Sequence, residues 1–492
     1  MISISFFILS LICLFFIKNR FVKITGSIFS ILFCLVCNFN FLLLYYTGNY
    51  LNFGNLNIFL SSIKGAPLMS FYKLIILIFV LILASILFGF IIYKRIKLSH
   101  KSFKFMGYLY IILIIVAIYF NPLTNSIKDM YRISHYQYHP NFIKKFKEIY
   151  KKPVIKTPKK SKNIVYIYLE SFSRNFTTKF KNLTPNINSL KNRLDFTNIN
   201  QIPYGASITI EGLFASACGY PYSVIKYGTK KDEKIELTNA KPKFKNLNMT
   251  CANKILKSLG YYTYFIKGGN LEFQNAYGFL KYMRYDKAQG KDELLKRGAK
   301  NLNEWGIDDD DMLEIAFDDF LKLSQEKDKF LQVILNIGMH VPNGFVSKKC
   351  KNLKYLDGLN SILNATKCTD FLVADFINKI KSSKYSKNTI IVIQSDHLMP
   401  YALAKGLNDE NMGNSKIFFT ILDDDIEGVK IIDNHGSSLD TFTTLLGYMG
   451  ISDEMNLGRN ILKINSVNKM VPGLFYQGAM GIVDSVKYEE DF

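Results

Sequence analysis

The segment NIVYIYLE, residues 163–170, decides how this chain folds, because an apolar run rich in residues that favour β-structure ends on a carboxylate, Glu170. A short apolar run of this kind predicts a buried β-strand. A second apolar run, residues 388–394, is followed by Ser395 and then by Asp396 and His397. Ligands of α/β sheets bind at the carboxyl ends of the strands, so these side chains are candidate site residues.

Thr209 lies between the two runs, with Gly205 shortly before it and a short helix predicted over Ile210–Cys218, which Gly219 closes. A hydroxyl at the amino terminus of a helix lies at the positive end of the helix dipole. A metal ion beside it lowers the pKa of the hydroxyl and makes it a nucleophile. A threonine at a helix start is also an ordinary cap or core residue, and the spacing alone leaves both interpretations open.

The rest of the chain after residue 161 predicts an α/β domain. Further short apolar runs occur at Tyr262–Ile266, Leu331–Ile337 and Ile417–Leu422, and helical periodicity at Asp309–Leu323, Asp370–Ile380 and Ser438–Met449. Strands that alternate with helices predict a mainly parallel sheet sandwiched by helices. Carboxylate, imidazole and hydroxyl ligands without thiolate favour one divalent cation, Mn²⁺ first, with Zn²⁺ or Mg²⁺ as alternatives.

The first quarter of the chain is membrane-like. Four apolar stretches lie at Ile2–Ile17, Ile24–Tyr46, Phe71–Tyr93 and Phe105–Phe120. Each is close to the roughly 20 residues that span a bilayer as a helix. Lys and Arg crowd the first and third loops, which places those loops in the cytoplasm and both termini outside. We therefore expect a four-helix transmembrane domain at 1–123, a basic juxtamembrane linker at 124–160 and an extracytoplasmic domain at 161–492.

The formal net charge is +22, but no nucleic-acid recognition motif accompanies it, and we expect no nucleic-acid partner. Part of the charge is concentrated before the predicted α/β domain, at Lys144, Lys145, Lys147, Lys151, Lys152, Lys156, Lys159 and Lys160. Anionic lipid headgroups attract such clusters by roughly 1 kcal/mol per residue. The segment is either a surface that rests on the lipid bilayer or a solvated linker.

Four of the seven cysteines lie in the predicted extracytoplasmic domain. In an oxidising compartment an even number predicts two disulfides, and pairing by nearest sequence neighbours gives Cys218 with Cys251 and Cys350 with Cys368. Sequence does not fix the connectivity, and four reduced core thiols are the alternative.

These residues carry a resemblance. The blocks at Asn163–Ser171, Gly205–Pro221, Trp305–Asp309 and Ser395–Leu398 resemble the signature blocks of the lipoteichoic acid synthase and membrane phosphoglycerol transferase family, in the alkaline-phosphatase/sulfatase superfamily. The blocks occur in family order, and residues 439–446 and 457–460 resemble its late motifs, with Thr443 in place of a proline. The Thr209 block, the Cys350–Cys368 pair and Leu398 are closest to the branch that modifies periplasmic glucans.

The resemblance implies roles for individual residues. Thr209 would be the nucleophile, and it would share the metal with Glu170, Asp396 and His397. His340 would be a second catalytic residue, in contact with the transferred phosphate or the leaving group. Substrate contacts are implied for His340, Trp305, Gly269, Asn270 and His435. Gly269 and Asn270 have a simple turn as the alternative, and the surroundings of His435 do not align with the family pattern.

The implied activity is metal-dependent transfer of phosphoglycerol from phosphatidylglycerol to a periplasmic or cell-surface glycan or polyol, at the bacterial cytoplasmic membrane. The reaction would pass through a covalent phosphothreonine-type intermediate and release diacylglycerol. A phosphoethanolamine transferase acting on lipid A or a surface glycan is an alternative, although its typical Thr-Ala-x-Ser-x-Pro block is replaced here by Thr209-Ile-Glu-Gly212. A sulfatase would need a Cys/Ser-x-Pro-x-Arg motif, which the sequence lacks. A non-catalytic membrane protein is a third alternative, but Thr209 and the three ligands are all retained.

Overall fold

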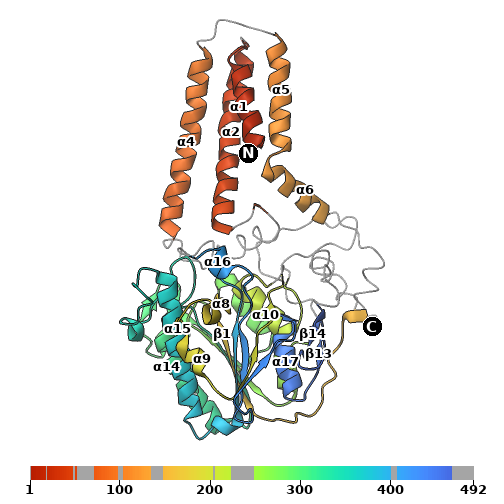
Figure 1. Cartoon of the computed structure of the whole chain (residues 1–492), viewed down its shortest axis with the longest axis vertical. Helices are drawn as coiled ribbons and strands as arrows, with labels where there is room; N and C mark the ends of the chain where they lie inside the picture. The colour runs from red at the N-terminus through yellow and green to blue at the C-terminus, as the bar shows by residue number, and fades with distance from the viewer. Residues whose placement is uncertain are drawn as a thin grey trace. The chain divides into compact units, whose positions relative to one another are not determined.

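The apolar segments at the amino terminus form helices in the computed structural model, which describes residues 2–17, 19–47, 50–51, 71–97, 104–134, 148–202, 206–222, 249–400 and 407–467. The chain divides into two compact units, of which the first comprises residues 1–56 and 67–136. Its helices are α1 (Ile2–Leu14), α2 (Arg20–Thr47), α4 (Tyr72–Lys97), α5 (Lys104–Tyr119) and α6 (Pro122–Ser134) (Figure 1). Helix α1 packs against α5, and α2 packs against α4.

Two of these helices are long and apolar enough to cross a membrane, over Arg20–Tyr45 and Tyr72–Arg95. Helices α5 and α6 add a third candidate if the pair, bent by 61°, is one span. Helix α1 is apolar, but its 13 residues are shorter than a typical span. These helices make the chain a membrane protein, whereas four crossings and their orientation stay predictions.

The second unit is built on an eight-stranded sheet. Its strands are β1 (Asn163–Leu169), β2 (Arg193–Phe196), β4 (Tyr262–Lys267), β5 (Lys287–Gln289), β8 (Phe330–Leu335), β9 (Thr389–Ser395), β10 (Phe419–Leu422) and β11 (Val429–Ile432). Their order is β11-β2-β10-β9-β1-β8-β4-β5. Strand β1 is central and pairs in parallel with β9 and β8.

Helices cover both faces of the sheet. One core contains Tyr166 and Tyr168 of β1, under α10 (Thr209–Cys218), α11 (Ala252–Ser258), α12 (Ala276–Tyr282) and α17 (Thr441–Tyr448). The opposite core contains Val165 and Ile167, under α8 (Asn175–Thr178), α9 (Pro185–Ser189), α14 (Asp309–Glu326) and α15 (Ser361–Lys381) (Figure 1). All seven residues of β1 are buried, as expected of a parallel strand covered on both sides. The predicted fold class is confirmed.

Several details differ from the prediction. Strand β10 is antiparallel to both of its neighbours, β9 and β2, a direction that an apolar run does not reveal. The strand expected to end at Ile337 ends at Leu335, because the next residues turn toward a buried carboxylate described below. Helix α15 begins nine residues before the predicted Asp370, where Asn360 caps it by accepting a hydrogen bond from the backbone of Leu363.

The lysine-rich segment before β1 is fastened to the α/β unit over its described part. Lys151 and Asn456 exchange backbone hydrogen bonds of 2.9 and 2.7 Å. The ammonium groups of Lys160 and Lys162 form ion pairs with the fully buried Asp423, at 3.3 and 2.6 Å. This part of the segment is therefore neither a free linker nor wholly available to a lipid surface. Lys144, Lys145 and Lys147 lie outside the described residues.

Both predicted disulfides are present, between Cys218 and Cys251 and between Cys350 and Cys368. The pairs are separated by 33 and 18 residues. Closing loops of this length restricts the unfolded chain and typically stabilises a protein by about 2–4 kcal/mol.

We expect the double substitution of Cys350 and Cys368 by serine to lower the free energy of unfolding by about 2–4 kcal/mol. The bridge joins the turn Lys348–Cys350 to α15 and closes a loop with a sequence separation of 18, so its loss gives the unfolded chain more conformational freedom. Denaturant unfolding of the detergent-solubilised protein measures the change, with the reduced native protein as the control. Free thiols at these positions in non-reducing peptide mapping would contradict the assignment.

Candidate active site

Two adjacent parallel strands place three predicted site residues together. Strands β1 and β9 pair with Leu169 opposite Ser395, so the next residues on each strand, Glu170 and Asp396, emerge side by side. The ligand atoms of Glu170, Asp396 and His397 all lie within 4.8 Å of one another, and all three residues are buried. The structure thus brings together the metal-ligand set expected from sequence.

Thr209 begins α10 beside this cluster, and its hydroxyl donates a 3.1 Å hydrogen bond to Oε2 of Glu170. The helix lies against the cluster because Gly212 has no side chain. A Cβ at Gly212 would come within 1.9 Å of the carbonyl oxygen of Asp396. The amide of Ile210 is capped from another loop by Gln274, at 3.0 Å. Substitutions at Gly212 would therefore displace the threonine.

A left-handed residue orients both carboxylates. Ser171 has φ 52°, and the turn lets its backbone amide donate to Oδ1 of Asp396 at 2.8 Å. Its hydroxyl donates to Oε1 of Glu170 at 2.7 Å. A non-glycine residue in this conformation is strained by about 1–3 kcal/mol, which is characteristic of functional sites.

The donor set fits a divalent cation. Nδ1 of His397 lies 2.9 Å from the carbonyl oxygen of Leu398 and must carry the proton, because a carbonyl only accepts. Nε2 then faces Oε1 of Glu170 and Oδ2 of Asp396 at 3.4 and 3.5 Å. That Oδ2 atom is buried and accepts no hydrogen bond from the described residues. Two carboxylates, an imidazole and a hydroxyl are ligands of Zn²⁺, Mn²⁺ or Mg²⁺.

Proton binding and metal binding compete at this cluster. Burial alone would lower the pKa of His397, but the charges of Asp396 and Glu170 outweigh it and raise the pKa to about 10. Burial, together with the charge of Glu170, raises the pKa of Asp396. A divalent cation held by Glu170, Asp396 and His397 would take the place of the shared proton, so its apparent affinity would rise with pH in the range below the raised pKa of His397.

A buried carboxylate supports the cluster from the side of β8. The amide of Glu170 donates to Oδ1 of Asn336 at 2.8 Å, and Nδ2 of Asn336 donates to Asp309 at 2.9 Å. Asp309 also accepts the backbone amides of Ile337 and Gly338, at 2.9 and 3.0 Å. Burial raises the pKa of Asp309 to about 6. This network, which sequence analysis did not identify, fixes the loop that leads to His340.

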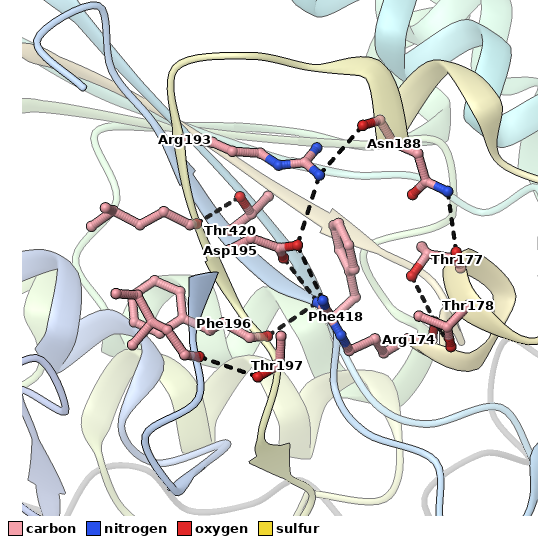
Figure 2. A network of polar contacts seen from close by, with 12 residues as sticks. Arg174, Thr177, Thr178, Asn188, Arg193, Asp195, Phe196, Thr197, Phe418 and Thr420 are labelled. Carbon is pink, nitrogen blue, oxygen red and sulfur yellow. Dashed lines mark hydrogen bonds and ion pairs between the residues drawn. The ribbon is translucent and has the colours of Figure 1, made fainter. Parts of the chain in front are cut away.

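A network on the opposite side holds the chain after Glu170 (Figure 2). The guanidinium of Arg174 donates to both oxygens of Asp195, at 2.8 and 3.1 Å, and to the carbonyl of Phe196. The backbone amide of Arg174 donates to the carbonyl oxygen of Lys416 at 2.9 Å. The loop that carries Glu170 is thus anchored to β2 and to the segment before β10.

A pocket opens beside the cluster at the carboxyl ends of β4 and β8. It is lined by Glu170, Thr209, Lys267, Gly269, Asn270, Phe273, Trp305, Leu335, Ile337 and His340. The rings of Trp305 and His340 stack with centroids 3.5 Å apart, and Phe273 meets Trp305 edge to face at 5.2 Å. Nε1 of Trp305 is buried and donates to no described residue. The pocket therefore offers an apolar wall and an available donor next to Thr209.

Lys267 is a pocket residue that sequence analysis missed. It is the last residue of β4 and only 5% exposed. Burial lowers the pKa of its ammonium to about 8, although the charges of Glu170 and Asp396 oppose the shift. The rule that identified Glu170, a polar residue at the carboxyl end of an apolar strand, would have found Lys267 as well.

The remaining predicted site residues separate into two places. Gly269 and Asn270 line the pocket, where Oδ1 of Asn270 accepts the amide of Glu272 at 2.7 Å and closes a turn. His435, for which a substrate contact was expected, does not line this pocket. It lies in another pocket, with Nε2 3.1 Å from Nδ2 of Asn200.

A mainly parallel sheet, with two buried carboxylates, an imidazole and a threonine hydroxyl grouped at its carboxyl edge, is the arrangement expected of the class of metal-dependent enzymes that resemble alkaline phosphatase. The sulfatase family model matches residues 162–451, and the chain belongs to this family. The model of the phosphoglycerol transferase I N-terminal domain matches residues 1–138.

Curated relatives and a solved structure agree with this assignment. The chain is 35% identical over 333 residues to phosphoglycerol transferase I of Salmonella choleraesuis, and 33% identical over 438 residues to that of Escherichia coli O81. These matches cover 66% and 87% of the chain but only 42% and 55% of the relatives, so the chain spans about half their length. A crystal structure of an alkaline phosphatase superfamily protein from Vibrio parahaemolyticus superposes with a TM-score of 0.51 at 22% identity, covering 68% of this chain and 77% of that one. At 22% identity, the similarity to the Vibrio parahaemolyticus structure supports the fold alone.

Proposed function

We propose that this protein transfers phosphoglycerol from a phosphatidylglycerol-type lipid to a hydroxyl of a cell-envelope glycan, with Thr209 as the nucleophile. The observation that carries the proposal is the position of the Thr209 hydroxyl, 3.1 Å from a carboxylate oxygen of the buried ligand cluster. The relatives named phosphoglycerol transferase I support the transferred group.

In the first step, the oxygen of Thr209 attacks the lipid phosphorus. The Thr209–phosphorus bond forms, the bond from phosphorus to the diacylglycerol oxygen breaks, and one proton passes from the threonine hydroxyl to the released diacylglycerol. A divalent cation on Glu170, Asp396 and His397 would lower the pKa of the threonine hydroxyl and neutralise phosphoryl charge; Mn²⁺ is the proposed ion. In the second step an acceptor hydroxyl attacks the same phosphorus and forms a new bond to it, the bond from phosphorus to the oxygen of Thr209 breaks, and the proton of the acceptor returns to that oxygen.

His340 is proposed to move the proton at the leaving oxygen. Its Nδ1 lies 2.9 Å from the carbonyl oxygen of Val341 and so carries a hydrogen, which leaves Nε2 to exchange a proton with substrate. Burial lowers the pKa of His340, and the charge of Glu170 opposes the shift. The negative charge of a bound phosphodiester would also raise this pKa and favour the protonated ring. The same nitrogen would deprotonate the incoming acceptor in the second step.

Lys267 favours a phosphoglycerol over a phosphoethanolamine headgroup. Its buried ammonium faces the pocket that the headgroup would enter. A phosphoryl group attracts this charge, whereas the ammonium of ethanolamine would be repelled by it. Glycerol is neutral, and its hydroxyls can accept from Nε1 of Trp305. The charge of Lys267 therefore supports transfer of phosphoglycerol over transfer of phosphoethanolamine.

The donor also accounts for the apolar helices, because a lipid substrate requires the site to work at a bilayer. We propose that the α/β unit lies on the outer side of the bacterial cytoplasmic membrane, in agreement with the charge distribution of the loops. The two disulfides suit an oxidising compartment.

The covalent intermediate provides the test. Full-length protein is incubated with Mn²⁺ and phosphatidylglycerol vesicles in the absence of acceptor, quenched in acid and digested. We expect the peptide that contains Thr209 to gain the mass of one phosphoglycerol group, with release of an equal amount of diacylglycerol. Phosphatidylethanolamine vesicles are the control for headgroup selectivity. Diacylglycerol release without a modified peptide would contradict the covalent mechanism, and an adduct formed only from phosphatidylethanolamine would contradict the donor.

A further inference from the structure

A second pocket, of about 310 Å³, lies away from the metal-ligand cluster. Asn198 follows β2, and Asp433, Asn434 and His435 follow β11, so the pocket begins at the carboxyl ends of two neighbouring parallel strands. Residues 461–465 complete its wall. Its size is in the usual range for a small-ligand site.

This pocket opens at the same edge of the sheet as the cluster. Strand β10 is antiparallel to both β9 and β2, so β9, β2 and β11 all point the same way. The order β11-β2-β10-β9 puts three strand intervals between the pocket and Asp396. At about 4.8 Å each, these intervals amount to about 14 Å. The pocket containing Lys267 lies on the other side of the cluster, at the ends of β8 and β4.

Polar side chains continue along the edge between the pocket and the cluster. Nε2 of His435 lies 3.1 Å from Nδ2 of Asn200, and Oδ1 of Asn200 accepts from the ammonium of Lys416 at 2.5 Å. The next residue, Gln201, accepts the amide of Leu398, which follows the metal ligand His397, at 2.6 Å. Polar side chains thus occupy the part of the edge that joins the pocket to the cluster.

The chemistry of the pocket favours a neutral, hydroxylated ligand. Side-chain amides of Asn198 and Asn465 and the imidazole of His435 both donate and accept hydrogen bonds, as sugar hydroxyls require. Asp433 adds an exposed carboxylate that would repel a polyanionic acceptor. The ammonium of Lys463 pairs with Asp453 at 3.1 Å, and the ammonium of Lys416 beside Asn200 balances the remaining carboxylate, so the charges around the pocket nearly cancel and suit a neutral ligand.

We propose that this pocket is the acceptor subsite and that it binds a neutral glycan, which leads from β11 and β2 along the sheet edge to Thr209. The inference rests on the proposed transferase function and extends it to the acceptor class. The lipid donor enters from the side of Lys267 and Trp305, and the glycan from the side of Asn198 and Asp433. The two substrates then reach one phosphorus from separate surfaces.

Asn465→Trp tests the subsite, because the exposed Asn465 lies on its rim and an indole there fills it. Full-length protein in phosphatidylglycerol vesicles is given neutral glucose oligosaccharides as acceptor. We expect the KM for the oligosaccharide to rise about tenfold or more, with the change on the acceptor KM rather than on the donor KM. Asn388→Trp is the matched control, at an exposed position before the amino end of β9 on the opposite edge of the sheet. An unchanged acceptor KM in Asn465→Trp would overturn the proposal.

Direct binding separates this proposal from the transferase function. Saturation-transfer NMR with the same oligosaccharides should show binding to Thr209→Ala protein and its loss in the Thr209→Ala, Asn465→Trp double variant. If native protein releases no diacylglycerol while binding still depends on residue 465, the transferase function fails and the glycan site stands. If Thr209→Ala protein binds no oligosaccharide, or the double variant binds equally well, the glycan site fails.

Discussion

Replacing Thr209 with alanine is expected to lower diacylglycerol release from phosphatidylglycerol by about a thousandfold or more, because the attacking oxygen is removed. Metal binding should remain, since Glu170, Asp396 and His397 are unchanged and their ligand atoms lie within 4.8 Å of one another. Diacylglycerol release and metal content are measured on the same full-length preparation. Loss of turnover with retained metal would show that the side chain of Thr209 is needed for the reaction and not for metal binding.

Two variants make this result specific. Thr209→Ser keeps a hydroxyl at the start of α10 and should retain measurable release and adduct formation. Thr178→Ala removes an exposed threonine at the end of α8 and should behave as the native protein. Near-native release from Thr209→Ala would show that another group, such as an activated water, attacks the phosphorus.

Replacing Asp396 or His397 with alanine is expected to remove metal and activity together. Each supplies one of the three closely grouped ligand atoms. Loss of a group that only hydrogen-bonds to a metal ligand typically lowers metal affinity about 10–100-fold. Loss of a ligand itself should therefore lower the affinity by more than about a hundredfold. Titration with Mn²⁺ and Zn²⁺ measures the affinity, and elemental analysis measures the occupancy.

The matched control is Asp328→Asn, an exposed carboxylate in the turn after α14.

The pH dependence of metal affinity adds a second readout, because metal must displace a proton held by His397 in the metal-free protein. The affinity of native protein should therefore increase by about tenfold per pH unit as the pH rises toward the raised pKa, for each proton displaced. A variant of Asp396 that binds metal as tightly as native protein would contradict the ligand assignment.

The strand ends were predictable because burial and local chemistry suffice to mark them. A run such as residues 163–169 is apolar throughout because helices cover both faces of its strand. A carboxylate that directly follows such a strand is costly to bury unless it binds a partner, which identified Glu170 and Asp396 as candidate site residues. Thr209 was found by the same local reasoning, together with the family resemblance, and the structure places it beside Glu170.

Other features depend on which strands are neighbours, and no local pattern encodes that. The direction of β10 determines that β2 and β11 end at the same edge as β9, which brings the pocket of His435 to that edge. Asp309 supports Glu170 through hydrogen bonds that pass by way of Asn336. Glu170 is more than a hundred residues from both of them in the sequence.

The sequence by itself thus determined the sheet type, the apolar amino-terminal helices and the candidate residues for metal binding and nucleophilic attack, because each follows from short-range patterns of burial and polarity. The tertiary structure alone decided which of those residues meet, the inclusion of Lys267 in the pocket and the separation of His435 from the cluster. The physical reason is that strand order and loop packing depend on contacts between distant segments, whose free energy appears only when the whole sheet is assembled.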